Sequence, residues 1–229
     1  MLTAADPGAR RRVADRLRAA LLLGEANAAL RRRNVRLTAI LVGVGVLGKI
    51  LLSGAPNIEP ILAVSLFAGM VLVPAYALLV PVLAALLNVA FASAILYPNT
   101  YGLPEVAALA AFLVTGYLFV GLAGGRIRRR VLFRTRTIAL ATAVSVPLTV
   151  AWDVWTAFGN WLTISRFAPY HWSLEQTFQM QVPFTLLHLI SSLVFVPLIG
   201  AGLGYYVEHV LPEGSGSPEP SQQGLEIAP

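Results

Sequence analysis

The sequence predicts an all-α integral membrane protein, a bundle of six transmembrane helices with both termini in the cytoplasm. Of its 229 residues, 57% are hydrophobic and only 12% are charged, which lies outside the usual balance of soluble proteins. Fifteen of the seventeen Lys and Arg residues fall within residues 10–36 and 126–136. Such segments collect on the cytoplasmic side of a membrane. The chain must therefore cross the membrane an even number of times between the two basic blocks. We predict four crossings between these blocks and two after the second block.

Residues 1–36 form a predicted basic cytoplasmic arm. Within residues 8–34, apolar side chains recur at helical spacing among five arginines, at Val13, Leu17, Leu21 and Leu22. A helix of this kind suits the inner membrane surface, where its arginines meet anionic headgroups. The alternative is an orientation signal with no partner of its own.

The first three predicted spans lie between residues 37 and 96. Residues 37–54 cover about 27 Å at the helical rise, enough for one crossing. Two prolines, Pro56 and Pro60, then predict a tight outer loop, because proline fixes its own φ and excludes the preceding residue from the helical region. Residues 61–96 contain no charge, and we interpret them as two short spans with a turn near residues 73–75.

The remaining spans are separated by segments rich in turn-forming and interfacial residues. Residues 97–102 predict an outer loop, and the Trp and Phe residues near position 158 suit the outer interface. Residues 160–180 are expected to be a further outer segment. The predicted spans are residues 105–124, 137–158 and 181–207. The membrane domain is therefore 37–210, and residues 211–229, rich in Pro, Gly, Ser, Gln and Glu, predict a disordered cytoplasmic tail.

The glycines of the first span resemble a phosphate-binding loop but predict a different use. Residues 43–50 follow most of the GxxxxGK[ST] pattern, yet Ile50 replaces the hydroxyl residue that would bind magnesium, and the segment lies inside an apolar helix. The spacing of Ala39 and Gly43 instead favours close approach by another helix. Similar pairs at residues 121–125 and 200–204 predict internal packing.

Polar residues in the outer halves of the spans predict an outward-facing substrate site. Ionisable groups at membrane depth are costly and tend to be functional. One helical face carries Asp153, Thr156 and Asn160, and a second stripe descends the last span. The predicted substrate-binding residues are Asn57, Glu59, Asn88, Tyr97, Trp152, Asp153, Thr156, Asn160, Gln181, Thr185 and His188. The alternative is that these groups only hold helices together, at about 0.6 kcal/mol per contact.

Other classes of function find little support. The chain has no cysteine, and it shows neither a metalloprotease nor a nucleophile-elbow motif. We therefore predict no enzyme, no cofactor and no metal site. The net charge of +6 lies next to the spans, where topology explains it, so no nucleic-acid partner is predicted. Two alternatives remain open: a membrane structural or assembly protein without a small ligand, and a membrane enzyme acting on lipid-linked precursors.

Two segments carry a resemblance to a known family. The Ala-Pro-Asn-Ile-Glu-Pro segment at 55–60, followed by Phe-Ala-Gly at 67–69, and the Ala-Trp-Asp-Val-Trp-Thr-Ala-Phe-Gly-Asn segment at 151–160 are similar to segments of the substrate-binding S component of energy-coupling factor (ECF) transporters. The nearest groups are the cobalamin-related and uncharacterised ones. Together with the six short spans, the resemblance covers about residues 37–211.

The resemblance implies that the protein, in the cell membrane, captures a vitamin or related micronutrient from outside the cell. The first outer loop would close over the ligand. It also implies association with a membrane T component and two cytosolic ATPases. Family members contact the T component through an Ala-xxx-Ala strip in the first helix, and the matching positions are Ala39 and Gly43. The glycine at the second position and the long basic arm depart from the family pattern.

Overall fold

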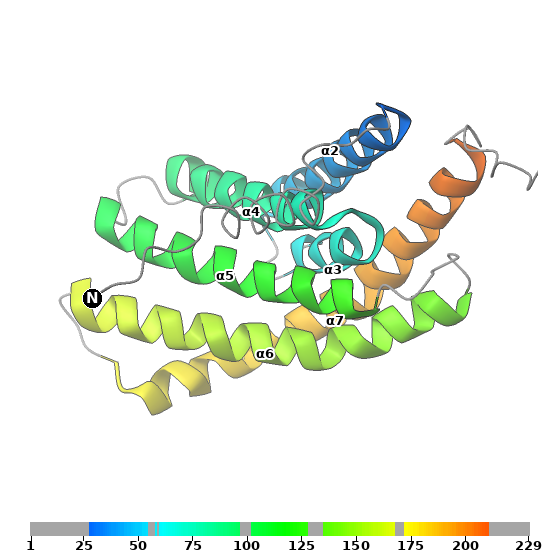
Figure 1. The fold of residues 1–229 in the computed structure, drawn as a ribbon. Helices are drawn as coiled ribbons and strands as arrows, with labels where there is room; N and C mark the ends of the chain where they lie inside the picture. The colour runs from blue at the N-terminus through cyan, green and yellow to red at the C-terminus, as the bar shows by residue number, and fades with distance from the viewer. Residues whose placement is uncertain are drawn as a thin grey trace, which may run out of the picture.

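The computed structural model describes residues 28–54, 58, 60–96, 102–127, 135–167 and 172–210. In these ranges every regular element is a helix (Figure 1), which confirms the all-α prediction. The elements are α2 (Ala28–Leu51), α3 (Ile61–Val71), α4 (Pro74–Phe91) with the π-helical turn η1 (Ala92–Leu96), α5 (Leu103–Ile127), α6 (Thr135–Phe167) and α7 (Leu174–His209).

Five of the described helices, all except α3, are long and apolar enough to cross a membrane. The outer surface is also apolar, because large side chains such as Leu122, Leu186 and Leu198 are well exposed. Soluble monomers rarely leave large apolar patches in contact with water. The protein is therefore a multi-pass membrane protein.

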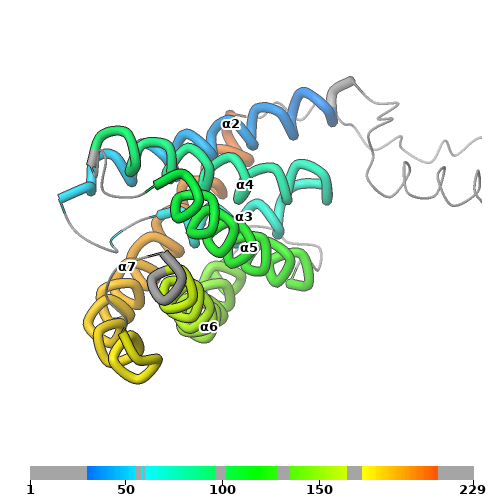
Figure 2. Tube along the Cα trace, turned by 90° about the vertical axis from the view of Figure 1, so that its left-hand side faces the viewer, coloured from blue at the N-terminus to red at the C-terminus, as the bar shows by residue number. Residues whose placement is uncertain are grey.

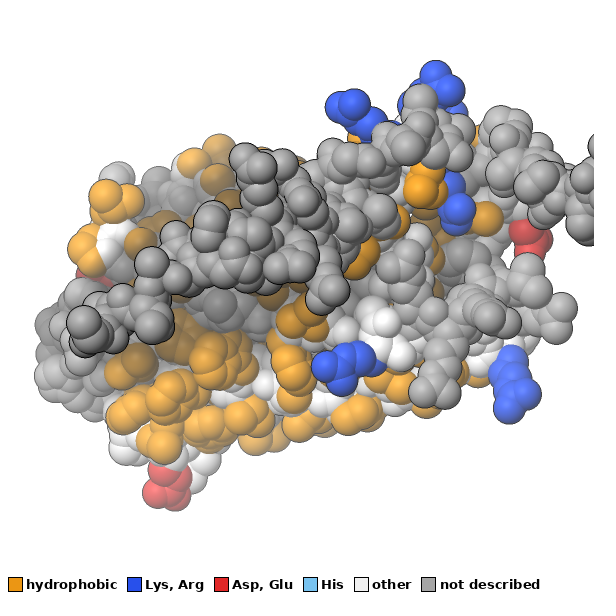
Figure 3. Space-filling model, viewed as in Figure 1, with side chains coloured by type: hydrophobic (Ala, Val, Ile, Leu, Met, Phe, Trp, Pro, Cys, Tyr) orange, Lys and Arg blue, Asp and Glu red, His pale blue; other side chains and the backbone are white. Residues whose placement is uncertain are grey.

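Successive helices run in alternating directions, so the described arginines of the two basic blocks gather at one end of the molecule, whereas Lys49 lies in the last turn of α2. The start of α2, the end of α5, the start of α6 and the end of α7 all lie toward the right in Figure 1. Lys and Arg side chains occupy the right-hand half of the same view in Figure 3. Arginines of both basic blocks, among them Arg31, Arg126 and Arg136, belong to these helix ends. This arrangement agrees with the predicted topology.

The short helix α3 forms the centre of the fold. It packs against α2, α4, α5, α6 and α7, and its residues from Ile61 to Met70 are all buried. Figure 2 shows α2, α4 and α5 around it. Its length is about 16 Å at the helical rise, roughly half of a hydrocarbon core. The count of six spans is therefore approximate, because α3 is a short helix enclosed by five long ones.

A proline sets the connection between α3 and α4. Leu72 and Val73 are extended, and Pro74 occupies the first turn of α4. Proline disfavours the helical conformation in the residue before it but fits the first helical position. The predicted turn near residues 73–75 is confirmed. Of the two short spans predicted beside it, only α3 is short, because the helix after the turn is long enough to cross a membrane.

Glycines bring α3 and α5 into backbone contact. A Cβ at Gly69 would overlap the carbonyl oxygen of Gly121, and a Cβ at Gly124 would overlap that of Leu66. In α7, Gly200 lies against Phe67, since a Cβ there would come within 2.8 Å of the end of that ring. The internal packing predicted for Gly121 and Gly200 is confirmed.

Several helices extend beyond the predicted spans. Residues 160–167 and 174–180, expected to be part of an outer segment, are helical. A capping box explains the start of α7: Gln176 N donates to Ser173 Oγ (3.1 Å), and Ser173 N donates to Gln176 Oε1 (2.9 Å). This Ser-x-x-Gln pattern is a helix-start signal. At the other end of the chain α2 begins at Ala28, inside the predicted basic arm, whereas residues 1–27 and 211–229 lie outside the described residues.

The α3–α5 contact generates a stability prediction. We expect Gly69→Ala to destabilise the protein by about 1–3 kcal/mol, the usual cost of extra volume in a packed interior. The measurement is the thermal unfolding midpoint in a mild detergent. Gly43→Ala is the matched control, because nothing lies within 4 Å of a Cβ at that position and alanine is the better helix former. Equal midpoints for the two variants would contradict the close packing of α3 on α5.

A buried carboxyl group between two helices

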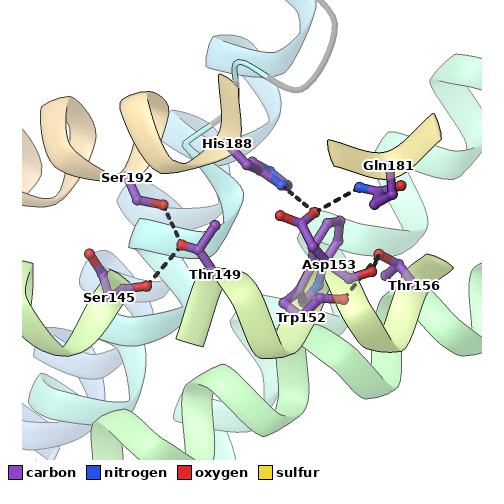
Figure 4. A network of polar contacts seen from close by, with 8 residues as sticks. All are labelled: Ser145, Thr149, Trp152, Asp153, Thr156, Gln181, His188 and Ser192. Carbon is purple, nitrogen blue, oxygen red and sulfur yellow. Dashed lines mark hydrogen bonds and ion pairs between the residues drawn. The ribbon is translucent and has the colours of Figure 1, made fainter. Parts of the chain in front are cut away.

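The candidate site lies where α6 and α7, which pack along each other, place polar side chains face to face. Asp153 Oδ1 on α6 accepts a hydrogen bond from Gln181 Nε2 at 3.1 Å. The same oxygen lies 3.0 Å from His188 Nδ1. Gln181 and His188 are seven residues apart on α7, so both reach the same face of α6. Figure 4 shows the two side chains converging on one carboxyl group.

This carboxyl group is buried. Asp153 and His188 are each 1% exposed, within helices long and apolar enough to span a membrane. An ionisable side chain at such depth needs hydrogen-bond or charge partners. Gln181 and His188 both contact Oδ1, but Oδ2 has no hydrogen-bond partner among the described residues. Oδ2 is therefore a buried polar atom that Gln181 and His188 leave without a described hydrogen bond.

Aromatic rings form one wall of this group. The indole ring of Trp152 meets the imidazole of His188 nearly edge to face, with centroids 4.8 Å apart and an 80° angle between the planes. Trp152 also packs against the buried Tyr117 of α5, at a centroid distance of 4.9 Å. Aromatic pairs with these separations are favourable beyond the area that they bury. Trp152 thus connects α5 to the polar contact between α6 and α7.

A second hydrogen bond joins the same two helices one turn away. Thr149 Oγ1 and Ser192 Oγ are 2.7 Å apart and buried. Because Thr149 has a single hydroxyl hydrogen and donates it to Ser145 O (2.8 Å), Ser192 is the donor in the contact between the helices. The contact of Thr149 was not predicted from the sequence, although Thr149 lies four residues before Asp153, as His188 lies four residues before Ser192.

The other predicted site residues are distributed differently. Thr156 donates to the carbonyl oxygens of Trp152 (3.0 Å) and Asp153 (3.2 Å) within its own helix. Asn160 and Thr185 are half-buried on α6 and α7. Three more predicted residues lie outside the described residues: Asn57, Glu59 and Tyr97.

Asn88 lies apart from the candidate site. It is 8% exposed on α4, a helix that packs mainly against α2, α3 and α5. Its Oδ1 has no hydrogen-bond partner among the described residues. The structure therefore brings together Trp152, Asp153, Gln181 and His188, while Asn88 belongs to the opposite part of the fold.

The donor set does not favour a metal centre. Within the described ranges, no three His, Cys, Asp or Glu residues are grouped closely enough to hold an ion. Asp153 and His188 alone supply fewer ligands than structural or catalytic zinc requires. The arrangement instead places a hydrogen-bonded polar group in an apolar surrounding.

Residues 28–212 match the model of a family of unknown function, DUF6580. The chain belongs to this family. The match includes all of the described helices of this DUF6580 protein and therefore the whole candidate site. No curated protein and no solved structure matches the chain.

The two contacts between α6 and α7 allow a direct comparison. In double-mutant cycles with alanine, we expect a coupling energy above about 1.5 kcal/mol for Asp153 and His188, because hydrogen bonds that involve charged groups fall in that range. The hydroxyl pair Thr149 and Ser192 is the control, expected near 0.6 kcal/mol as for neutral contacts between membrane helices. Stability measured by denaturant titration in the same detergent gives both values. A weaker coupling for the carboxyl pair than for the hydroxyl pair would contradict the assigned contact.

Proposed function

We propose that this protein is the substrate-capture (S) component of an ECF-type uptake transporter in the cell membrane, and that it binds a vitamin or related micronutrient. The observation that carries the proposal is the buried carboxyl group of Asp153, held by Gln181 and His188 with its Oδ2 open. A carboxyl group that served packing alone would gain stability by having both oxygens hydrogen-bonded. An acceptor left open inside an apolar protein favours a role in ligand binding.

The composition of the site also supports binding. Ligand pockets are mostly apolar, with a few directional polar groups that orient the ligand. Trp152 provides an aromatic surface, and Asp153 and Gln181 provide directional hydrogen bonding. An ionised carboxylate only accepts hydrogen bonds, so a ligand of the Asp153 carboxylate presents an N–H or O–H donor to it. The ring N–H and hydroxyl groups that many vitamins carry meet this requirement.

The energy for uptake must come from another protein in this proposal. The loop-like pattern at residues 43–50 lies within the helix α2, where it cannot cradle phosphates. A separate T component and two cytosolic ATPases would supply the energy. Ala39 is exposed on α2, and nothing lies within 4 Å of a Cβ at Gly43, so this face allows another helix to approach closely.

The glycines further along α2 serve a different surface. A Cβ at Gly45 would contact Val64, and one at Gly48 would meet Pro60. These two glycines therefore face α3 and the residue that precedes it. This division leaves Ala39 and Gly43 as the proposed partner contact, as the resemblance implies.

A structural or assembly role is the second candidate. The contact between Thr149 and Ser192 favours it, because a neutral bond between two membrane helices is typical of internal packing. If this role were the only one, changes at Asp153 would alter stability without altering the binding of any small molecule.

Ligand-induced stabilisation tests the proposal. We expect one member of a panel of vitamins and related micronutrients to raise the unfolding temperature of the purified protein, since a ligand at about 100 times its Kd adds about 2.7 kcal/mol. Asp153→Asn should weaken binding of that compound about tenfold or more, because loss of a hydrogen bond to a charged group costs at least about 1.5 kcal/mol. Native mass spectrometry of protein purified in mild detergent identifies any ligand that is already bound.

Glu175→Gln is the matched control, the same kind of change at an exposed position in the first turn of α7. It should leave the affinity unchanged. If no compound stabilises the wild type and no ligand copurifies with it, the uptake proposal fails and the structural role is preferred. A covalently altered product released from the added compound would indicate an enzyme instead.

A further inference from the structure

A groove lies on the surface where the start of α4 meets the end of α5. Its volume is about 240 Å³. Among the residues that line it, Gly69, Leu72 and Ala77 are buried, whereas Pro74, Gly125 and Arg126 are exposed. Arg126 is the only lining residue with a polar side chain. The groove is therefore apolar along its length and carries one cation.

The groove lies at the end of the membrane spans and not in their middle. Pro74 is the first residue of one span, and Arg126 lies in the last turn of another. The end of α5 belongs to the end of the molecule where the described arginines of both basic blocks gather (Figure 1). The predicted topology places this end on the cytoplasmic side. The groove therefore opens at the level of the headgroups of the cytoplasmic leaflet.

The helices that form the groove favour an anion at this level. Neither α3 nor α4 contains a charged residue, and the only carboxyl side chain of α5 is that of Glu105. Glu105 lies twenty-one residues before Arg126, about 31 Å away along the helix axis. The start of α4, beside the groove, has no side-chain cap, and the start of a helix carries a partial positive charge. This charge adds to that of Arg126.

We propose that the groove binds an anionic phospholipid of the cytoplasmic leaflet, with its phosphate on Arg126 and the first part of one acyl chain in the groove. A guanidinium group can form two parallel hydrogen bonds with a phosphate. Basic pockets between membrane helices on the cytoplasmic side are suited to anionic headgroups.

The apolar lining favours a lipid over a water-soluble phosphate. Leu72, Leu78 and Leu122 present only hydrocarbon to the groove, and a soluble phosphate would leave these surfaces unused. A volume of about 240 Å³ holds only the first part of an acyl chain, so the rest of the chain lies along the lipid-facing surface of α5. The site is separate from the Asp153 group on α6 and does not depend on the proposed uptake function.

The test of the charged end uses the full-length protein in mild detergent after removal of copurified lipid. Phosphatidylglycerol and phosphatidylcholine with the same acyl chains are titrated separately, and native mass spectrometry gives the affinity for the first lipid that binds. We expect the wild type to bind phosphatidylglycerol about fivefold more tightly, the contribution of one arginine near a membrane surface. Arg126→Gln should remove this preference. Arg136→Gln is the matched control and should retain it, because Arg136 is exposed at the same end of the molecule but does not line the groove.

A second pair of variants tests the apolar part of the groove. A Cβ at Gly125 would meet only Gly69 O, at an ordinary distance of 3.8 Å. Gly125→Leu should therefore fill the groove without disturbing the backbone contact between α3 and α5. We expect it to weaken the binding of both lipids about tenfold, roughly the effect of losing two buried CH₂ groups. Gly202→Leu is the control, because Gly202 is exposed on α7 and nothing lies within 4 Å of a Cβ there.

Four outcomes would each overturn the proposal. They are equal affinity of the wild type for the two lipids, an unchanged preference in Arg126→Gln, equal effects of Arg126→Gln and Arg136→Gln, and equal losses in Gly125→Leu and Gly202→Leu. Glycerol phosphate is the water-soluble comparison, since it offers the phosphate without an acyl chain. Displacement of phosphatidylglycerol by glycerol phosphate at equal concentration would assign the groove to a soluble anion and would also overturn the proposal.

Discussion

The backbone contact between α3 and α5 is the constraint on which the rest of the structure depends. Gly69 and Gly124 let the two helices approach until carbonyl oxygens meet Cα atoms, and α3 is enclosed by the other helices as a result. With α5 fixed in this way, Tyr117 is buried against Trp152. Trp152 then sets the rotation of α6, which directs Asp153 toward α7. The polar group is therefore placed by a chain of packing contacts that begins at glycine.

Trp152 borders two environments that differ in chemistry. It packs against the hydrogen-bonded group of Asp153, Gln181 and His188, in which Asp153 Oδ2 has no partner among the described residues. Trp152 also lines an apolar groove of about 310 Å³ between α5 and α6. A single ring, held by aromatic neighbours on α5 and α7, thus borders both the polar group and the groove.

Much of this fold could be predicted from the sequence, because long apolar segments and clustered arginines report directly on a membrane environment. Residues 137–158 and 181–207 lie within α6 and α7, and the helical spacing of Asp153, Gln181 and His188 was sufficient to predict a shared site. The short length of α3 was harder to predict, since composition alone does not distinguish a buried helix from one that faces lipid. The separation of Asn88 from Asp153 depends on how non-adjacent helices pack, which periodicity within one helix does not reveal. Trp155 illustrates the same limit, because its partners Phe112 and Thr115 lie about forty residues earlier in the chain.

The shortness of α3 has a consequence for biogenesis. A hydrophobic segment of about 16 Å is too short to be held stably by lipid alone, and α3 gains most of its environment from helices synthesised after it. Its partner glycines Gly121 and Gly124 emerge from the ribosome about fifty residues later. Until α5 has been synthesised, α3 therefore lacks the helix on which it packs most closely. The buried position of α3 is reached by packing of the helices and not by partitioning of this short segment into lipid by itself.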